Sequence, residues 1–394
     1  MRLSIVIVII LAVVSILTDY YIWLYLRKNA KSKVLRIVHV VFAAVSFLTI
    51  VTVILIPHRS SGDALVVAKM WAFYTFMSIY VPKILFILTD LLAKTPKLFG
   101  HRKLRPVSIA GLVLAAALFA AMWWGALVNR KCVSVTEQEV AVKNLPQAFD
   151  GYRLIQFSDL HLGTYGSDTT YVNRIVETIN SLHPDLVVFT GDFVNRRAEE
   201  IKPFCSTLAR ISAPDGVYAI FGNHDYGDYV NWTSPEKKAA NRTYFLEYLR
   251  DMGWKLLADE TAYLRRGNDS IALIGVENIG DPPFPSYGSL SKAYADVSDS
   301  VTKILLTHNP AHWCSDIRNN PEANIALTLS GHTHAMQIEI FGISPSALKY
   351  ETWGGLYTDS LARHLYVNIG IGTVLIPSRI GATPEITLIT MHNS

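Results

Sequence analysis

The sequence predicts a chain in two parts. The first, residues 1–130, is a bundle of four transmembrane helices, and the second, residues 131–394, is an α/β domain whose two sheets form a sandwich flanked by helices. Two observations support this division. The 394 residues are 51% hydrophobic and only 17% charged, which is too apolar for an ordinary soluble protein, and the apolar excess lies in the first 130 residues. The remaining residues alternate between β-rich runs and segments of helical spacing.

Four long apolar runs define the first part. They cover about residues 3–26, 34–57, 64–93 and 107–128, and each exceeds the ~20 residues that cross ~30 Å of hydrocarbon. Tyr20 and Trp23 near the end of the first run, and Trp123 near the end of the fourth, suit an interfacial aromatic belt. The sequence therefore predicts a multi-pass integral membrane protein, with the lipid bilayer as a partner.

The cationic residues of the connectors predict the orientation of the bundle. Lys and Arg of short loops favour the cytoplasmic side of a membrane. The second connector holds one such residue, Arg59, whereas the first and third hold five each: Arg27, Lys28, Lys31, Lys33 and Arg36, and Lys94, Lys97, Arg102, Lys103 and Arg105. We therefore expect both termini outside the cell and, in a bacterial inner or cell membrane, a periplasmic or extracellular second domain.

Three ionisable residues, Asp19, Lys83 and Asp90, lie inside the apolar runs. Each costs about 2.5–3.5 kcal/mol at the centre of an inserted helix, and such residues are candidates for function. The two Asp residues lie near helix ends, and Lys83 can pair with one of them or extend to the interface. These positions favour a structural role, although a function for the three residues stays open.

In the second part, β-rich runs end five times at Asp, Asn or His. The runs cover residues 154–157, 186–189, 217–220, 303–307 and 325–329. They are followed, in order, by Asp159-x-His161, Gly191-Asp192, Gly222-Asn223-His224-Asp225, His308 and Gly331-His332-x-His334. Residues i and i+2 of a strand point to the same side, so each Asp-x-His or His-x-His pair can aim at one point. Each block alone is weak evidence for a metal site, but five in succession are not expected by chance.

Other features of the second part narrow the class. Helical spacing is found at 168–182, 201–211 and 234–252, and 263–264 with 271–276 form an expected strand pair. The segment 133–142 is expected to form a strand or a hairpin. Cys132, Cys205 and Cys314 have no C-x-x-C spacing, which argues against a zinc knuckle. A net charge of +4 without a basic stripe argues against a nucleic-acid partner.

The order of the five blocks resembles that of the calcineurin-like metallophosphoesterases. The resemblance runs from about Val133 to the C-terminus, and the tail with Gly370, Gly372 and Arg379 is similar to that of the membrane-associated YkuE- and YaeI-type subgroup. It implies a four-layer αββα fold and a metal-dependent phosphoric ester hydrolase. It also implies two divalent metal ions, and the nitrogen and oxygen ligands suit Mn, Fe, Zn or Mg.

The resemblance assigns roles to single residues. It implies that Asp159, His161 and His334 hold one metal, that Asn223, His308 and His332 hold the other, and that Asp192 bridges them. The same resemblance makes His224 a proton donor to the leaving group or a stabiliser of phosphoryl charge. Asp225 is expected to orient His224. The pair Ala335-Met336 departs from the commoner Gly-Gly, and Met336 is expected to narrow the mouth of the site.

Arg379 is expected either to bind a substrate phosphate or to form a structural ion pair, for example with Glu385. The expected reaction is hydrolysis of a phosphodiester or pyrophosphate bond by a hydroxide that bridges the metals, on a lipid-linked or cell-envelope substrate. One alternative is a pyrophosphatase of the lipid A pathway that cleaves UDP-2,3-diacylglucosamine. A further alternative is a non-enzymatic metal-binding membrane scaffold or transporter-linked sensor.

Overall fold

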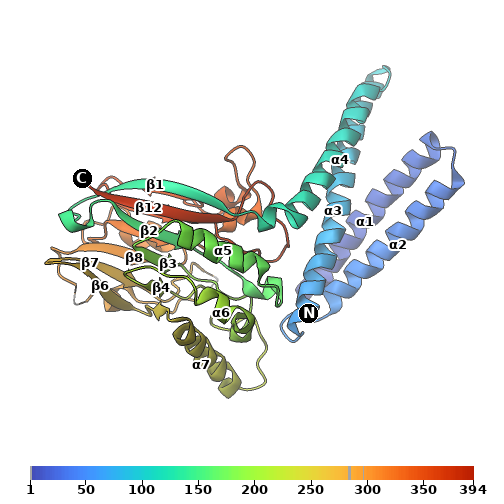
Figure 1. The fold of residues 1–394 in the computed structure, drawn as a ribbon. Helices are drawn as coiled ribbons and strands as arrows, with labels where there is room; N and C mark the ends of the chain where they lie inside the picture. Colours follow the sequence, from blue (N-terminus) through green and yellow to red (C-terminus); the bar gives the residue numbers. More distant parts are fainter. Residues whose placement is uncertain (1, 283–284, 296) are drawn as a thin grey trace. The chain divides into compact units, whose positions relative to one another are not determined.

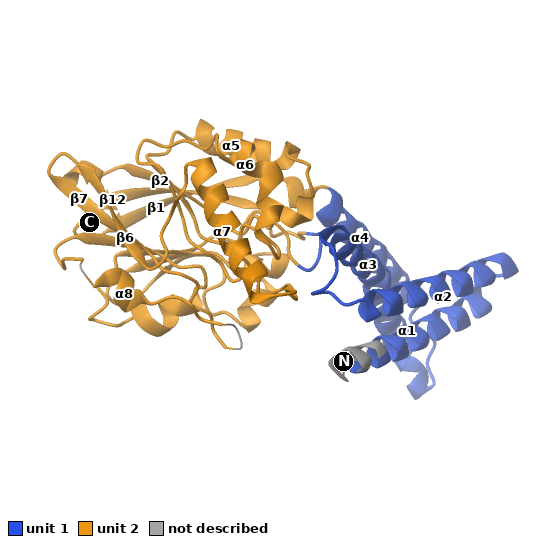
Figure 2. Cartoon of the chain, turned by 90° about the horizontal axis from the view of Figure 1, so that it is seen from below, with its two compact units in different colours: residues 1–127, 375–378 blue, residues 128–374, 379–394 orange. Residues whose placement is uncertain are grey.

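The computed structural model describes residues 2–282, 285–295 and 297–394. The chain divides into two compact units (Figure 2). Unit 1 comprises Met1–Leu127 with Leu375–Ser378, and unit 2 comprises Val128–Val374 with Arg379–Ser394. The division after Leu127 lies close to the predicted boundary after residue 130.

The described residues of unit 1 form four long helices at about the positions of the four predicted apolar runs. All four are long and apolar enough to cross a membrane. Many of their large apolar side chains, such as Val34 and Leu48, are exposed in the protein alone, as expected of surfaces that face lipid. The helices are α1 (Arg2–Asn29), α2 (Lys33–Leu55), α3 (Asp63–Lys94) and α4 (Arg105–Leu127).

The three ionisable residues inside the spans are all ion-paired. Lys83 Nζ of α3 lies 2.7 Å from Asp19 Oδ1 of α1, and Tyr80 OH donates a 2.6 Å hydrogen bond to Asp19 Oδ2. Asp90 is fully buried and lies 2.8 Å from Lys94 Nζ and 2.5 Å from Lys103 Nζ. These contacts support the structural interpretation, because ionisable groups within membrane spans commonly pair with one another.

Unit 2 contains two six-stranded sheets (Figure 1). The strand orders are β1-β12-β2-β3-β4-β5 and β10-β11-β9-β8-β7-β6. In the first sheet the bounds are β1 Ser134–Val142, β12 Glu385–Asn393, β2 Tyr152–Phe157, β3 Leu186–Phe189, β4 Val217–Ala219 and β5 Lys255–Leu256. In the second they are β10 Gly355–Thr358, β11 His364–Val367, β9 Leu327–Ser330, β8 Thr302–Leu306, β7 Asp269–Gly275 and β6 Glu260–Arg266.

Three apolar cores separate the layers and confirm the predicted four-layer sandwich. One core, with Ile155 and Val187, lies between the first sheet and the helices α5 (Thr170–Ser181), α6 (Cys205–Leu208) and α7 (Pro235–Met252). A second core, with Leu154 and Leu306, lies between the two sheets. A third, with Leu305, lies between the second sheet and the segment that holds α8 (Leu290–Tyr294) and Trp313.

Of the two alternatives for the segment 133–142, a strand or a hairpin, the structure has the strand: β1 pairs in parallel with β12 from the other end of the chain. One local prediction needs correction. The helix predicted over 201–211 is a 3₁₀ segment, Ala198–Phe204, followed by the single turn α6. Pro203 has no backbone N–H to donate and its ring crowds the preceding turn, which prevents a continuous α-helix there.

The topology brings the five ligand blocks together. Strands β2, β3 and β4 are parallel in the first sheet, and β7, β8 and β9 are parallel in the second. Parallel strands present their carboxyl ends at one edge, where α/β sheets place their sites. Gln156 at the end of β2 joins the sheets there, because its Nε2 donates a 2.8 Å hydrogen bond to the carbonyl of Ser330 at the end of β9.

Candidate metal centre

The predicted ligands lie in loops just after the strands, in a backbone conformation that non-glycine residues rarely adopt. Five of them have φ between 47° and 74°: Asp159, His161, Asp192, His332 and His334. This left-handed conformation costs energy and is concentrated at functional sites. The pairs Asp159–His161 and His332–His334 therefore do not owe their positions to strand alternation, as the i, i+2 argument assumed, but to individually strained loop residues.

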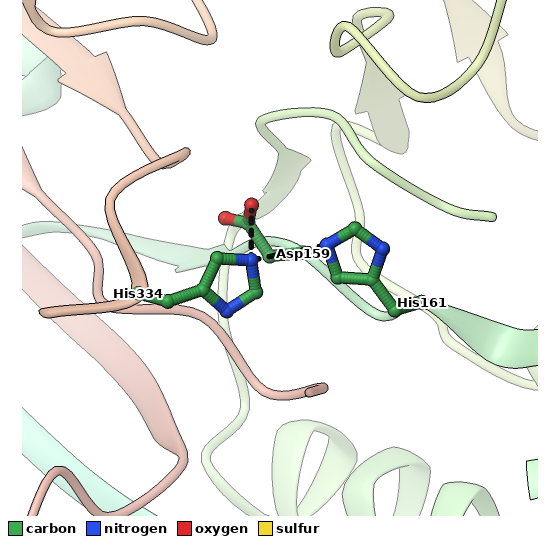
Figure 3. A group of neighbouring side chains, drawn as sticks. All are labelled: Asp159, His161 and His334. Carbon is green, nitrogen blue, oxygen red and sulfur yellow. Dashed lines mark hydrogen bonds and ion pairs between the residues drawn. The ribbon is translucent and has the colours of Figure 1, made fainter. Parts of the chain in front are cut away.

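The first group comprises Asp159, His161 and His334, whose side chains converge (Figure 3). All three residues are buried. His334 Nε2 lies 3.1 Å from Asp159 Oδ1 and 3.0 Å from His161 Nε2. These three atoms are close enough to bind one cation.

The second group comprises Asp192, His308 and His332. His308 Nε2 lies 3.2 Å from His332 Nδ1 and 3.3 Å from Asp192 Oδ2. The same Asp192 Oδ2 lies 3.6 Å from His161 Nε2 of the first group. One carboxylate oxygen thus faces nitrogens of both groups.

Each of the four imidazoles is held by a contact of its other ring nitrogen. The partners are Val194 O for His161 Nδ1 at 3.2 Å, Thr190 O for His308 Nδ1 at 2.8 Å, Tyr350 OH for His332 Nε2 at 3.0 Å and Arg379 Nη2 for His334 Nδ1 at 3.1 Å. Metal-binding imidazoles show this pattern, because the outer contact fixes ring orientation.

Asn223 adds evidence that the centre fits cations. Its Nδ2 donates a 2.9 Å hydrogen bond to Tyr229 OH, whereas its Oδ1 is buried and, among the described residues, accepts no hydrogen bond. Buried polar atoms without a partner are costly, and a bound cation would satisfy Asn223 Oδ1. The two groups contain only carboxylate and imidazole ligands, which suit Mn, Fe, Zn or Mg.

Comparisons with known proteins agree with this geometry. A family model described as calcineurin-like phosphoesterase matches residues 152–336, and one described as probable calcineurin-like phosphoesterase, transmembrane domain, matches residues 1–130. The metallophosphoesterase YkuE of Bacillus subtilis is 30% identical over 292 residues, which cover 72% of this chain and 95% of YkuE. The chain belongs to the calcineurin-like metallophosphoesterases. It is a membrane protein and a metal-dependent phosphoester hydrolase.

Two further relatives carry informative names. A transmembrane protein with metallophosphoesterase domain from Danio rerio is 32% identical over 293 residues, covering 72% of this chain and 63% of that protein. The UDP-2,3-diacylglucosamine pyrophosphatase LpxG of Chlamydia trachomatis is 28% identical over 284 residues, covering 58% of this chain and 81% of LpxG.

In this metallophosphoesterase, His224 is oriented by a residue other than the predicted one. Its Nδ1 lies 2.7 Å from the carbonyl of Asn195, and its ring stacks on Tyr229 with centroids 4.4 Å apart. Asp225 instead accepts hydrogen bonds from the backbone N–H groups of Asp192, Gly222 and Val194. The expectation that Asp225 orients His224 needs correction, because its carboxylate is used to join the loops after β3 and β4.

The ionisation of Asp192 and Asp225 differs although both are buried. Burial opposes ionisation of Asp192, but the nearby imidazoles of His308 and His224 outweigh it and hold the pKa of Asp192 well below its ordinary value. Burial and the charge of Asp192 together raise the pKa of Asp225 well above its ordinary value. Asp192 is therefore the carboxylate suited to cations.

Two motif glycines allow close approach at the centre. A Cβ atom at Gly222 would collide with Asp192 Oδ1, and one at Gly331 would collide with the Ser158 hydroxyl and lie 2.5 Å from Asp159 Oδ2. Only glycine lets these backbones pass so near the two ligand carboxylates.

Arg379 is buried against His334 rather than exposed to solvent. Its guanidinium is fully buried and donates to the carbonyls of Gly372, Ala382 and Ile369 as well as contacting His334. This burial does not fit the predicted contact with a substrate phosphate, and no ion pair with Glu385 is found within the described part of the chain. Arg379 is placed to position His334.

Three residues next to the centre were not identified from the sequence: Tyr350, Tyr229 and Asn195. Tyr350 contacts His332, and the other two contact His224. Tyr350 and Asn195 belong to none of the five blocks, and Asn195 acts through its backbone carbonyl, which no side-chain pattern reveals. Tyr229 follows the Gly222–Asp225 block closely, and that proximity was the one available signal.

Proposed function

We propose that this chain is a dinuclear hydrolase, anchored in the membrane, that cleaves a phosphodiester or pyrophosphate bond of a lipid-linked or cell-envelope substrate. The observation that carries the proposal is the position of Asp192 Oδ2, 3.3 Å from His308 Nε2 and 3.6 Å from His161 Nε2. A carboxylate that faces two ligand groups is what a two-metal site requires.

The residues would divide the work as follows. Asp159, His161 and His334 would hold one cation, Asn223, His308 and His332 the other, and Asp192 both. When bound, two divalent cations neutralise phosphate charge and activate water. His224 would protonate the leaving oxygen through Nε2, since its Nδ1 is engaged by Asn195. Tyr229 and Asn195 would hold that ring in place.

The substrate class follows from the anchor. A domain tethered to four membrane spans meets bilayer substrates at a high effective concentration. The likeness to LpxG supports an acylated UDP-sugar pyrophosphate as a second candidate. That substrate is made in the cytoplasm, whereas the connector charges favour an outward domain. The side of the membrane on which the catalytic domain lies therefore discriminates between the two candidate substrates.

The non-enzymatic alternatives have less support. The seven predicted ligands are all present at the carboxyl edge of the sheets, and six of them form the two groups described above. The family match and the likeness to a named pyrophosphatase favour an enzyme. No nucleic-acid substrate is proposed, because the net charge of the whole chain is only +4.

The experiment uses the full-length protein purified in lipid nanodiscs. We expect two metal ions per chain by elemental analysis, turnover of a chromogenic phosphodiester, loss of turnover after chelation, and recovery with Mn. A single bound metal with full turnover would contradict the dinuclear assignment. Comparison of membrane lipid extracts with and without the active protein would then identify the substrate.

A further inference from the structure

The loop that follows His334 exposes large apolar side chains. We call residues 338–348 the apolar loop. Within it Phe341 is 100% exposed and Leu348 92% exposed, and Ile340 and Ile343 are also more than half exposed. Single exposed apolar residues are common on protein surfaces, but four large ones in so short a segment mark an interaction site.

The apolar loop is an ordered turn. Ile340 N donates to Ile343 O at 2.9 Å, and Ile343 N donates to Ile340 O at 3.1 Å. Phe341 and Gly342 form the tip, with φ of 55° and 75°, a combination typical of two-residue hairpin turns. Ser344 Oγ donates a 2.6 Å hydrogen bond to Ala335 O, which ties the turn to the loop that carries His334. The fold thus holds a large aromatic side chain outward at an unfavourable backbone position.

Charge is absent from the interior of the apolar loop. Between Glu339 and Lys349 the sequence contains only apolar residues, Gly, Pro and Ser. At one end, Lys349 contacts residues outside the loop, since its Nζ lies 2.8 Å from Tyr350 OH and 3.5 Å from Asp281 Oδ2. A loop tip without charge, such as residues 340–348, can enter an apolar medium without burying an ionised group.

The chain tethers the apolar loop to the end of a membrane span. Asn129, just after the end of α4 at Leu127, donates a 3.0 Å hydrogen bond from Nδ2 to Arg379 O. The next residue, Ile380, pairs with the start of the loop: Glu339 N donates to Ile380 O and Ile380 N donates to Gln337 O, both at 2.8 Å. Asn129 follows the end of α4 by two residues, and the hydrogen-bonded path from Asn129 through Arg379 and Ile380 to Glu339 ends two residues before Phe341.

We propose that the apolar loop inserts Phe341, Ile343 and Leu348 into the lipid bilayer, as a second membrane contact in addition to the four spans. Apolar side chains beside an existing anchor gain free energy by leaving water for the acyl region. Insertion would also bring Met336, which stands between His334 and the loop, next to the lipid. The proposal concerns the surface and does not depend on which phosphoester is cleaved.

The test places a fluorescent label at the tip of the loop. Phe341→Cys is made in the full-length chain with Cys132, Cys205 and Cys314 replaced by Ser, labelled with an environment-sensitive dye, and reconstituted into nanodiscs. Tyr263→Cys serves as the matched control, because Tyr263 is 42% exposed on the edge strand β6. Lipids carrying a nitroxide near the headgroup are then included or omitted.

We expect the label at position 341 to emit at shorter wavelength than the label at 263 and to lose most of its emission with nitroxide lipids. The control label should be unaffected by them. Emission at the wavelength of the control would show that the loop stays in water and would overturn the proposal. A blue shift without lipid quenching would also overturn it, because protein, either the bundle or a second copy of the chain, would then cover the loop. If Phe341→Cys does not fold, Leu348→Cys provides the same readout.

Discussion

Asp192 faces nitrogens of both ligand groups, with its Oδ2 3.6 Å from His161 Nε2 and 3.3 Å from His308 Nε2. We predict that Asp192→Asn loses both metals together with turnover, because a neutral amide cannot bridge two cations. Elemental analysis and phosphodiester turnover measure the two effects. Asp168→Asn is a suitable control, since Asp168 is exposed and belongs to neither ligand group. Two metals still bound per chain in Asp192→Asn would contradict the bridging role.

His224 separates proton transfer from metal binding. We predict that His224→Ala keeps normal metal content and loses turnover on the order of 10²–10⁴-fold with a poor alkoxide leaving group. The loss should be smallest with nitrophenolate, which leaves without a proton. His332→Ala, in contrast, should lose metal and fail with both substrates. Equal losses for His224→Ala on the two substrates would mean that His224 stabilises phosphoryl charge, and metal loss would make it a ligand.

Met336 occupies a position after His334 where related proteins more commonly have glycine, and its backbone conformation should cost stability. Ala335 and Met336 have φ of 50° and 45°, a conformation that glycine adopts without penalty. We predict that Met336→Gly raises the free energy of unfolding by about 1 kcal/mol, because Met336 is partly exposed and its side chain contributes little packing. Thermal unfolding measures the change. Ala209→Gly, at φ −59°, should lower stability instead, and the same sign for both variants would refute the explanation.

At the level of secondary-structure elements, an ion pair joins two of the membrane helices. Asp19 of α1 and Lys83 of α3 are both mostly buried and 2.7 Å apart. We predict that Asp19→Asn lowers stability in detergent by roughly 3–5 kcal/mol, because Lys83 is left without its counter-charge. The double variant Asp19→Asn, Lys83→Met should recover much of the loss. If the double variant is as unstable as the single one, the ion pair is not the cause.

The edge strand β1 of the first sheet has a pairing partner that no local sequence pattern could specify. The residues of β1 alternate as a strand should, but their partner β12 begins at Glu385, about 250 residues later. Local alternation predicts that a strand forms but does not predict which strand it pairs with. The helix predicted over 201–211 failed for a local reason instead, because Pro203 interrupts it despite the helical spacing.

For the whole molecule, the connector charges lead to a prediction about topology. Ion pairing of Lys94 and Lys103 with Asp90 does not weaken it, since the rule counts Lys and Arg rather than net charge. A reporter fused after Ser394 should therefore be active only outside the cytoplasm. Activity restricted to the cytoplasm would reverse the orientation and make the acylated UDP-sugar the leading substrate.

The sequence alone determined the features that depend on residue type and spacing. A bilayer demands about 20 apolar residues for each span, so the four helices could be read directly. Divalent cations bind Asp, Asn and His side chains, and β-rich runs directly before such residues indicate strands whose carboxyl ends lie at one edge of a sheet. Six of the seven predicted ligands therefore appear in the two groups that the structure brings together.

Only the tertiary structure decided how those residues are used. The left-handed backbone of His332 and His334, the turn of Asp225 toward three backbone N–H groups and the burial of Arg379 against His334 all depend on contacts between loops from different strands. The exposure of Phe341 is of the same kind, because a Phe in a sequence is ordinarily expected in a core. Side-chain roles at a site are set by non-local neighbours, and a linear sequence does not order those neighbours in space.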